Sequence, residues 1–547
     1  MPVPSAFNDL GTDAGLRDHV GWCWYQTSYT LNLNDCKSRT FLRFGSVNYA
    51  AFVFVNGKQV MSHIGGHLPF ENEITFKCGS TNQITVAVNN TLSANTIPPA
   101  EFTYKTGEAY PPGFFVMTPG FDFFNYAGIL RSVYVVKVGR QFVQSIKLDT
   151  NVDGSVLYEV KIDKTGLNGV DVVVSILDGV EVLSTADGET NGLKVVNPKL
   201  WWPRGYGDAN LYTFKVHLKS KKGDLIDAYE EVFGFRKISF DSNSLFINDK
   251  KFYCLGFGMH EDSELRGRGF DRVVMTKDLN LLEWTNGNCY RTSHYPYDEE
   301  RAYEADRRGI AVITETPGVG LKYWNKPELL ELHKKMVREM ITRDKNHPSV
   351  IAWSMANEPW SATDKATPYF DAVIKVAREM DSSRPITAVY GPTKSSDDKS
   401  AHLLDFICIN RYYGWYINMG KLSIINSTLS FDLMGWKNKF DKAIMLTEYG
   451  ADSLPSLSSL PSSDFTTEYQ DELLVETHKA LDFMRARGQL AGEMIWNFAD
   501  FMTDQALIRA LGNRKGIFTR QRQPKPSAFI LKKRYEVISK FNSKKKS

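Results

Sequence analysis

The sequence predicts a protein of three successive parts, in which two all-β segments precede a (β/α)8 barrel. Residues 1–138 and 139–240 carry short runs of β-branched and aromatic residues separated by Gly, Asn and Pro, which is typical of antiparallel sheets. From residue 241 the pattern changes to alternating strand-like and helix-like stretches. A chain of 547 residues is also long for a single domain, so several domains are expected.

The two all-β segments contain recognisable strands and one clear turn. Asn56-Gly57, between Ala51–Val55 and Gln59–Met61, is a two-residue sequence typical of a β-hairpin. The second segment has four strand-like runs spaced as in a small sandwich: Val156–Ile162, Val172–Leu177, Leu211–Leu218 and Tyr229–Phe235.

The third part carries eight strand-like runs. They are Phe252–Phe257, Asn288–Thr292, Ile310–Thr314, Val350–Met355, Pro385–Tyr390, Phe406–Asn410, Ala443–Thr447 and Gly492–Trp496. Amphipathic stretches separate them; two have their apolar residues on one helical stripe, namely Leu329, Leu332, Met336 and Met340, and Met275, Leu279 and Leu282. Eight strands alternating with helices over about 300 residues predict a (β/α)8 barrel. A doubly wound open sheet is the alternative, but no G-x-G-x-x-G follows an early strand.

Composition excludes several classes of function. With 66 basic and 63 acidic residues, the chain has no dense basic block of the kind that tracks nucleic-acid phosphates. We interpret Lys544-Lys545-Lys546 as a solvated terminus. No apolar run is long enough for a membrane span, and Met1–Ser5 does not resemble a signal peptide. The aromatic content of 13% suits both sugar stacking and sandwich cores.

The six cysteines are scattered along the chain: Cys23, Cys36, Cys78, Cys254, Cys289 and Cys408. None forms a C-x-x-C pair, so the sequence suggests neither a zinc site nor a disulfide framework. Most lie in strand-like runs, and we expect them to be small core residues. No metal or other cofactor is expected.

Two glutamates stand where predicted barrel strands end. Asn357-Glu358-Pro359 follows the fourth strand, and Glu448-Tyr449-Gly450 follows the seventh. Because active sites of such barrels lie at the carboxyl ends of the strands, we expect the two carboxylates to face each other across one pocket. Paired carboxylates cleave glycosidic bonds, with retention of configuration at a separation of about 5–5.5 Å and inversion at about 6.5–9.5 Å. Asn357 is suited to bind the sugar 2-hydroxyl, which makes Glu358 the acid/base and Glu448 the nucleophile.

Other predicted strand ends are polar or aromatic. They carry His260-Glu261-Asp262, Ser293-His294-Tyr295-Pro296-Tyr297, Arg411 to Tyr416 and Trp496-Asn497. His260 and His294 with Glu261 are a conceivable metal site, but without a closer ligand cluster we favour hydrogen bonds to sugar hydroxyls. Tyr412 is a candidate to position Glu448 through its hydroxyl.

Motifs along essentially the whole chain resemble the β-glucuronidases of glycoside hydrolase family 2. The stretches that carry the resemblance are Asp122-Phe123-Phe124-Asn125-Tyr126-Ala127-Gly128, Arg291-Thr292-Ser293-His294-Tyr295-Pro296-Tyr297, Arg343-Asp344-Lys345-Asn346-His347-Pro348, Trp496-Asn497-Phe498-Ala499-Asp500-Phe501 and Gly516-Ile517-Phe518-Thr519-Arg520. The resemblance implies a jelly-roll sugar-binding-like domain at 1–138, an immunoglobulin-like sandwich at 139–240 and a catalytic TIM barrel at 241–547. It also implies retention of configuration, with the roles of Glu358 and Glu448 given above.

The resemblance further implies how the substrate is recognised. An Asn-x-Lys motif that grips the substrate carboxylate in these enzymes is here Asn513-Arg514-Lys515, and a C6 carboxylate requires such a cation and donor. Arg509 is implied to lie near the carboxylate. Asp122, from the first domain, and His294 are implied to bind hydroxyls. Tyr412, Tyr416 and Trp496 are implied to form pocket walls.

The chain departs from the family pattern in two places. It begins near a Val-Pro-x-x-Phe-Asn-Asp segment, here Val3–Asp9, so the first domain is expected to be N-terminally truncated, with its stability in doubt. The stretch from Thr316 to Asn325 is short, which favours an open mouth that admits bulky or polymeric aglycones, including glycosaminoglycan-derived oligosaccharides. The family commonly forms homotetramers. Its animal members are lysosomal or secreted, and without a missing leader this chain would be cytoplasmic.

Three hypotheses about the function therefore stay open. The leading one is a retaining β-glucuronidase. The alternatives are another family 2 β-glycosidase, such as a galactosidase or galacturonidase, and a truncated, inactive carbohydrate-binding homologue.

Overall fold

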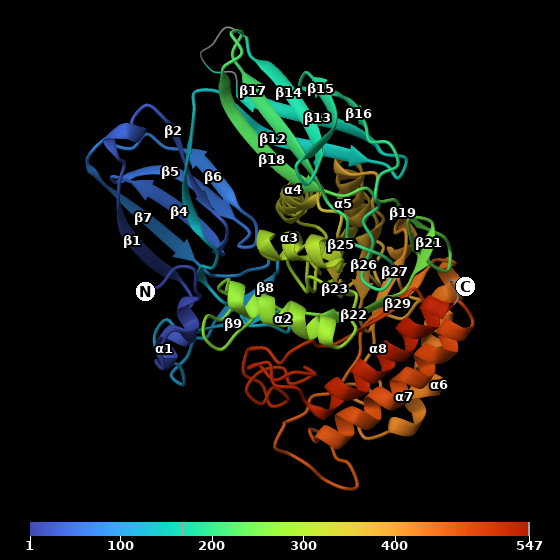
Figure 1. Ribbon diagram of the computed structural model, residues 1–547. Helices are drawn as coiled ribbons and strands as arrows, with labels where there is room; N and C mark the ends of the chain where they lie inside the picture. Colours follow the sequence, from blue (N-terminus) through green and yellow to red (C-terminus); the bar gives the residue numbers. More distant parts are fainter. Residues whose placement is uncertain (164, 166–168, 545–547) are drawn as a thin grey trace.

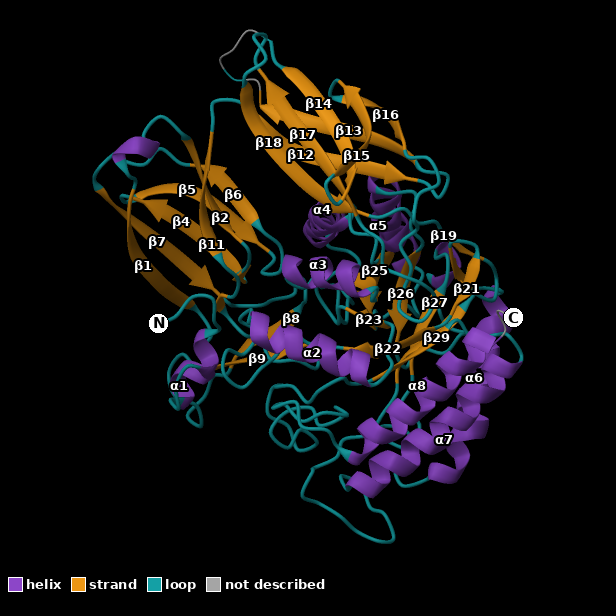
Figure 2. Cartoon of the chain, viewed as in Figure 1, coloured by secondary structure: helices purple, strands orange, loops and turns teal. Residues whose placement is uncertain are grey.

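The computed structural model describes residues 1–163, 165 and 169–544. Lys545 and Lys546 of the lysine-rich terminus lie outside the described residues. The described chain forms two β-sandwiches beside a barrel ringed by helices (Figure 1; Figure 2). Among the helices of this described part, none combines the length and apolarity that a membrane crossing requires.

The first part is an antiparallel sandwich. Its elements are η1 (Phe7–Asp9), α1 (Ala14–Arg17), β1 (Trp22–Thr30), η2 (Leu33–Asp35), β2 (Arg39–Phe44), β3 (Val47–Asn48), β4 (Ala50–Val55), β5 (Lys58–Ile64), β6 (Phe70–Glu73), β7 (Thr81–Asn89), β8 (Ala100–Tyr104), β9 (Phe115–Pro119), β10 (Gly128–Ile129) and β11 (Val133–Val138). The sheets β1-β7-β4-β5 and β11-β2-β6 share one core, to which Leu42, Phe44 and Val53 belong. The predicted turn is confirmed: Asn56 and Gly57 join β4 to β5 with φ of 51° and 80°, as a two-residue hairpin turn requires.

The second part is a smaller sandwich. It consists of β12 (Phe142–Thr150), β13 (Ser155–Asp163), β14 (Asp171–Asp178), β15 (Glu181–Asp187), β16 (Thr190–Lys194), β17 (Tyr212–Lys219) and β18 (Leu225–Phe233). The sheets β12-β13-β16 and β15-β14-β17-β18 close over alternating residues such as Val156, Val174 and Phe214. All four predicted runs are strands, although β18 begins four residues before the predicted Tyr229.

The third part is a closed parallel barrel, as predicted. After the small sheet β19 (Ile238–Phe240), β20 (Leu245–Ile247) and β21 (Lys250–Phe252), the barrel strands are β22 (Cys254–Gly258), β23 (Cys289–Arg291), β24 (Ala311–Glu315), β25 (Val350–Asn357), β26 (Ile386–Tyr390), β27 (Ile407–Asn410), β28 (Ile444–Glu448) and β29 (Gly492–Ile495). The helices are α2 (Arg272–Trp284), α3 (Glu299–Arg308), α4 (Pro327–Asp344), α5 (Ala366–Met380), η3 (Ala401–Leu403), η4 (Leu422–Ile424), α6 (Ile425–Phe440), α7 (Thr467–Ala486) and α8 (Pro526–Lys544).

Burial explains why these strands were visible in the sequence. Every residue of the eight barrel strands is buried, because side chains fill the barrel interior on one side and helices cover the other. The predicted stripes of α2 and α4 face this core, with Met275, Leu279, Met336 and Met340 almost fully buried. The alternation of strands and α-helices is interrupted once, because the short 3-10 helix η3 joins β26 to β27 in place of an α-helix.

The expectation of no disulfides was wrong. Cys36 is bonded to Cys78 and Cys254 to Cys289, with Cα–Cα distances of 5.6 and 5.7 Å. These pairs are 42 and 35 residues apart, so their sequence spacing contains no motif. The fold alone makes them neighbours, since Cys254 and Cys289 lie on the adjacent strands β22 and β23. Cys408 is free and buried, as expected for a core residue.

Candidate active site

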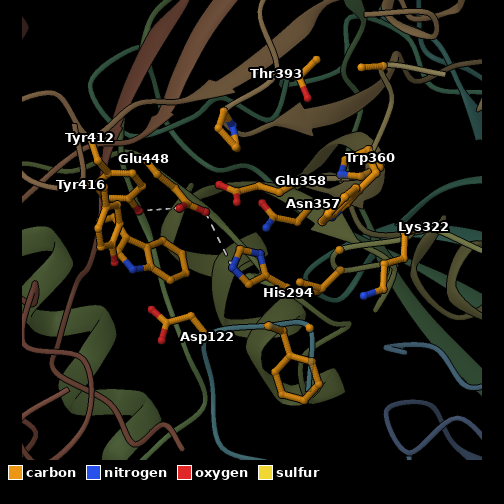
Figure 3. A pocket seen from close by; sticks show the side chains of 18 of the residues that line it. Asp122, His294, Lys322, Asn357, Glu358, Trp360, Thr393, Tyr412, Tyr416 and Glu448 are labelled. Carbon is orange, nitrogen blue, oxygen red and sulfur yellow. Dashed lines mark hydrogen bonds and ion pairs between the residues drawn. The ribbon is translucent and has the colours of Figure 1, made fainter. Parts of the chain in front are cut away.

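A cavity of about 860 Å³ opens at the carboxyl ends of the barrel strands (Figure 3). Its lining residues from the barrel and from the first sandwich are Gly120, Phe121, Asp122, His294, Val319, Gly320, Lys322, Trp324, Asn357, Glu358, Pro359, Trp360, Ala362, Thr363, Pro392, Thr393, Tyr412, Tyr416, Glu448, Trp496 and Arg509. The two predicted glutamates therefore share one pocket with most of the predicted substrate residues.

Glu448 is held by two hydrogen-bond donors. It is the last residue of β28, and its Oε1 accepts a hydrogen bond of 2.5 Å from Nη2 of Arg291. Its Oε2 accepts one of 2.6 Å from the hydroxyl of Tyr412, which confirms the predicted contact (Figure 3). Because a guanidinium only donates, this pair of contacts is matched to an ionised carboxylate.

Glu358 is held in a different way. Its backbone adopts the left-handed region with φ of 48°, and its N–H donates to Val389 O at 2.8 Å, at the step from strand to loop. Nδ2 of Asn410 donates to Oε1 at 2.8 Å, while the side chain passes close over Gly391, where a Cβ would lie 2.5 Å from Glu358 Cδ. The direct side-chain donor to Glu358 is thus a neutral amide, in contrast to the guanidinium on Glu448.

The two carboxyl groups are coupled. Burial raises the pKa of Glu358, opposed by the Asn410 hydrogen bond and the Arg411 charge. Burial also raises the pKa of Glu448 to about 8, and the charge of Glu358 adds to this while Arg291 opposes it. Such a pair holds a single proton over a wide pH range. The charged and hydroxyl donors on Glu448 favour its ionised form, whereas the direct side-chain donor on Glu358 is the neutral amide of Asn410.

Two further charged residues complete the site, and sequence reasoning did not select them. Arg291 ends β23, and its Nη1 donates to Glu315 Oε1 at 2.8 Å on the side opposite Glu448. Glu315 ends β24 and also accepts from His294 Nδ1 at 2.8 Å and from Ser354 Oγ at 2.7 Å. Burial opposes its ionisation, but the Arg291 charge and these hydrogen bonds hold the pKa of Glu315 below its usual value. Both residues end barrel strands, which is the signal that would have found them.

His294 is a neutral, oriented ring. Burial, with the charge of Arg291, lowers its pKa. The ring stacks on Trp496 with centroids 5.0 Å apart, and its Nε2 lies 3.7 Å from Glu448 Oε1. His294 therefore presents a polar edge beside Glu448 without adding a fixed charge.

A cationic region, defined by Arg509 and Lys515, lies beside Tyr416 in another part of the pocket. Arg509 donates to both carboxylate oxygens of Asp122, at 2.8 and 2.9 Å, and Asn513 Nδ2 donates to Asp122 Oδ2 at 2.7 Å. Asp122 follows β9 of the first sandwich, so two parts of the chain meet here. Lys515 donates to the hydroxyl of Tyr416 at 2.8 Å and pairs with Asp452.

These residues form two layers. Asp122, Tyr416 and Arg509 line the cavity, whereas, within the described chain, Asn513 and Lys515 are fully buried behind that lining. The Nζ atom of Lys515 lies 4.6 Å from the centre of the Tyr416 ring. Asn513 and Lys515 of the predicted Asn-x-Lys motif therefore lie behind the pocket lining. They contact that lining at Asp122 and Tyr416, respectively.

The arrangement of His260 and Glu261 does not favour a metal site. Glu261 pairs with Arg131 at 3.0 Å and with Arg301 at 3.2 Å, so guanidinium groups occupy its carboxylate. The His260 ring packs on Phe501 with centroids 4.0 Å apart. In the part of the chain that the structure describes, no three His, Cys, Asp or Glu side chains are grouped as metal ligands.

Comparison with known proteins gives matches along nearly the whole of this chain. The curated β-glucuronidases of mouse and human are each 42% identical to this chain, over 98% of it and 85% of their own length. That of Paenibacillus borealis is 41% identical over 100% of this chain and 92% of its own. Among solved structures, the β-D-glucuronidase of Dictyoglomus thermophilum superposes with a TM-score of 0.93 at 41% identity, covering 98% of this chain and 93% of that one.

A second solved relative carries a ligand. The β-glucuronidase of Ruminococcus gnavus in complex with D-glucaro 1,5-lactone has a TM-score of 0.91 at 38% identity, covering 98% of this chain and 92% of that one. The family models match in three consecutive blocks: the sugar binding domain at residues 6–139, the central family 2 domain at 140–236 and the TIM barrel domain at 238–540. This chain belongs to glycosyl hydrolases family 2.

Proposed function

We propose that this chain is a retaining β-glucuronidase, which hydrolyses β-D-glucuronides to D-glucuronate and an alcohol or phenol. The observation that carries this proposal is one pocket with a coupled carboxyl pair at one wall and a cationic region, with Arg509 and Lys515, at another. Relatives that match nearly the whole chain are β-glucuronidases. The Ruminococcus gnavus relative has been solved with uronic inhibitors.

The first half of the reaction uses the ionised Glu448 and the protonated Glu358. A Glu448 oxygen attacks the anomeric carbon while Glu358 donates its proton to the glycosidic oxygen, which leaves as the alcohol. The product is a covalent glucuronosyl ester of Glu448. In the second half, a water molecule gives a proton to the Glu358 carboxylate while its oxygen attacks the anomeric carbon. Glu448 is then released as a carboxylate.

Neighbouring residues position these groups. Tyr412 and Arg291 hold the two Glu448 oxygens and keep that carboxylate ionised before attack. Asn357, beside Glu358 on the pocket wall, is proposed to bind the sugar 2-hydroxyl. Asp122 and His294 are proposed to bind other hydroxyls, and Trp496 to form a wall against the ring.

The substrate carboxylate is proposed to bind in the cationic region. Arg509 and Tyr416 line the pocket directly, and Lys515 and Asn513 lie immediately behind them. A uronate carboxylate needs charge-assisted donors, which a neutral galactoside does not. In this proposal the substrate carboxylate enters a region where Asp122 pairs with Arg509 and Asp452 pairs with Lys515.

Comparison of nitrophenyl glycosides tests the proposal. The 4-nitrophenyl β-D-glucuronide should be cleaved with the highest kcat/KM, ahead of the β-D-galactoside and the β-D-galacturonide. Proton NMR of the first product should show the β-anomer, and a 2-deoxy-2-fluoro glucuronosyl inhibitor should label Glu448 in peptide mass spectra, with E448Q as the unlabelled control. Preference for either rival glycoside would refute the assignment. Absence of activity on all three would favour a carbohydrate-binding role.

The proposal also covers the oligomeric state of the protein and its natural substrates. Small β-glucuronides and glycosaminoglycan-derived oligosaccharides are both proposed substrates, and a homotetramer is the proposed assembly. Light scattering during gel filtration measures the molar mass, which for a tetramer is four times the 62.0 kDa of one chain.

A further inference from the structure

An exposed tryptophan stands at the rim of the pocket, and the mechanism above does not use it. Trp360 follows Glu358-Pro359 and lines the cavity, yet its side chain keeps 65% of its surface exposed. Single exposed hydrophobic side chains are common on protein surfaces, so Trp360 is informative because of its place on the pocket lining beside Glu358.

The position of Trp360 relative to the catalytic pair defines which part of a substrate it meets. Figure 3 shows Glu448 and Tyr412 on one side of the pocket, Trp360 and Lys322 on the other, and Glu358 between them. The acid must reach the glycosidic oxygen, so the leaving group departs past Glu358, away from the nucleophile. Trp360 therefore lies along the path of the aglycone, while the uronate end faces Arg509 and Tyr416.

The backbone of Trp360 is fixed although its ring is exposed. Its N–H donates to Leu321 O at 2.9 Å, and its carbonyl accepts from the indole N–H of Trp324 at 3.2 Å. Trp324 in turn packs edge-on against Tyr369 of α5, with centroids 5.0 Å apart. A ring presented from a fixed backbone loses little conformational freedom when a ligand stacks on it.

The facing rim is fixed to the first sandwich. Lys322 pairs with Glu101 of β8 at 2.6 Å, and Lys326 donates to Asn95 at 2.6 Å. Gly320 approaches Gly120 so closely that a Cβ would lie 2.5 Å from the Gly120 carbonyl oxygen. Lys322 also places its Nζ 5.6 Å from the centre of the Trp360 ring. The short loop from Thr316 to Asn325 is thus held in place, and Trp360 stays largely exposed although Lys322 of this loop lies over its ring.

We propose that Trp360 is the stacking platform of a leaving-group subsite that favours β-glucuronides whose aglycone presents a flat ring face. Aryl groups and pyranose rings share this chemistry, since both offer a face that packs on an indole. The inference rests on the proposed glucuronidase function and adds its leaving-group specificity.

Three substrates separate the contributions. One is phenyl β-D-glucuronide, one is an acyclic fluoroalkyl glucuronide whose alcohol matches phenol in acidity, and one is a disaccharide with glucuronate β-linked to an N-acetylhexosamine. W360A should raise KM about 2- to 10-fold for the ring aglycones and leave kcat and the acyclic substrate unchanged, from the usual energy of an aromatic pair. W360F should restore most of the loss. F431A, which removes another exposed aromatic ring on α6, is the matched control and should change nothing.

The outcomes are distinct. A rise in KM for the phenyl substrate alone or the disaccharide alone supports the platform and identifies which ring it serves. An equal rise for all three substrates, or none for the rings, overturns the proposal. Inhibition by free glucuronate should be the same in W360A and wild type, which checks that the rest of the pocket is intact. If the wild type cleaves none of the three, the proposed function itself has failed, which is a different result.

Discussion

Arg291 donates to Glu448 at 2.5 Å through one nitrogen while its other terminal nitrogen donates to the buried Glu315 at 2.8 Å. One guanidinium thus joins the ends of β23, β24 and β28 and fixes the side chain of the proposed nucleophile. The two carboxylates, both almost fully buried, also raise the pKa of Arg291 and keep it charged against the cost of burial.

Replacing Arg291 by Lys should therefore impair nucleophilic attack. A lysine ammonium cannot span two carboxylates with the geometry of a planar guanidinium. Losing one partner of a buried ion pair costs about 3–5 kcal/mol, so we expect kcat/KM to fall by at most about 10²- to 10⁴-fold. The rate of covalent labelling by a 2-fluoro inhibitor should fall in parallel, with E315Q as the companion variant that weakens the same support. Labelling within about twofold of wild type in R291K would contradict this role.

Removing Glu358 should affect substrates according to their leaving groups. In E358A the glycosidic oxygen receives no proton, so substrates with basic alcohols should lose far more kcat/KM than nitrophenyl substrates, by about 10²- to 10⁴-fold in total. Azide should restore turnover of nitrophenyl glucuronide, because a small anion can occupy the space of the carboxylate and attack the intermediate. The product should be β-glucuronosyl azide, detected by NMR. Loss of equal size for all leaving groups would indicate that Glu358 is not the acid.

The coupled pair predicts a bell-shaped pH profile of kcat/KM. Activity requires one proton on the pair, located on Glu358. Rising pH removes that proton from Glu358, and because burial raises the pKa of Glu358, the alkaline limb should lie above the usual range of a glutamate. Falling pH protonates the nucleophile and produces the acid limb. E358Q, assayed on nitrophenyl glucuronide, should lose the alkaline limb; a limb that persists there must come from another group.

The cationic region should determine specificity for glucuronides. R509A removes a proposed donor to the uronate carboxylate and K515A removes the cation behind Tyr416, and hydrogen bonds to charged groups contribute about 1.5–3 kcal/mol. We expect kcat/KM for nitrophenyl glucuronide to fall about 10- to 150-fold, with little change in any residual galactosidase activity. K479A, a solvent-exposed lysine on α7, is the matched control. Equal loss on both substrates would show a structural role.

The disulfide Cys36–Cys78 should stabilise the first sandwich. The bond closes a loop across 42 residues, and such links contribute about 2–4 kcal/mol. The double variant C36A/C78A should lower the first transition in scanning calorimetry, and reductant should do the same to wild type. C23A, which removes a free cysteine, is the control. An unchanged first transition in the double variant would mean that this bond does not limit stability.

Sequence and structure agree where local pattern carries the information. The barrel strands are short, fully buried apolar runs, so they were recognisable, and the strand-end rule brought Glu358 and Glu448 to one pocket. Arg291 and Glu315 also end barrel strands but were not selected, because the residues they bind lie on other strands and neither segment alone shows that pairing. The disulfides escaped for the same reason.

The Asn-x-Lys motif shows a subtler limit. The motif identified a cationic region, but a sequence motif does not show whether its side chains line the pocket or lie behind the lining. In the structure Lys515 is fully buried against Asp452 and Tyr416, and Arg509 forms the wall. Such layering depends on Asp122, which comes from a distant part of the chain.

The contact of Asp122 with Arg509 joins residues 387 positions apart. A ribosome synthesises the chain from its N-terminus, so Asp122 emerges long before Arg509, Asn513 and Lys515. During that interval the carboxylate has none of these three partners, and the nascent polypeptide has no complete pocket. The pocket can therefore be completed only after residues 509–515 have been synthesised.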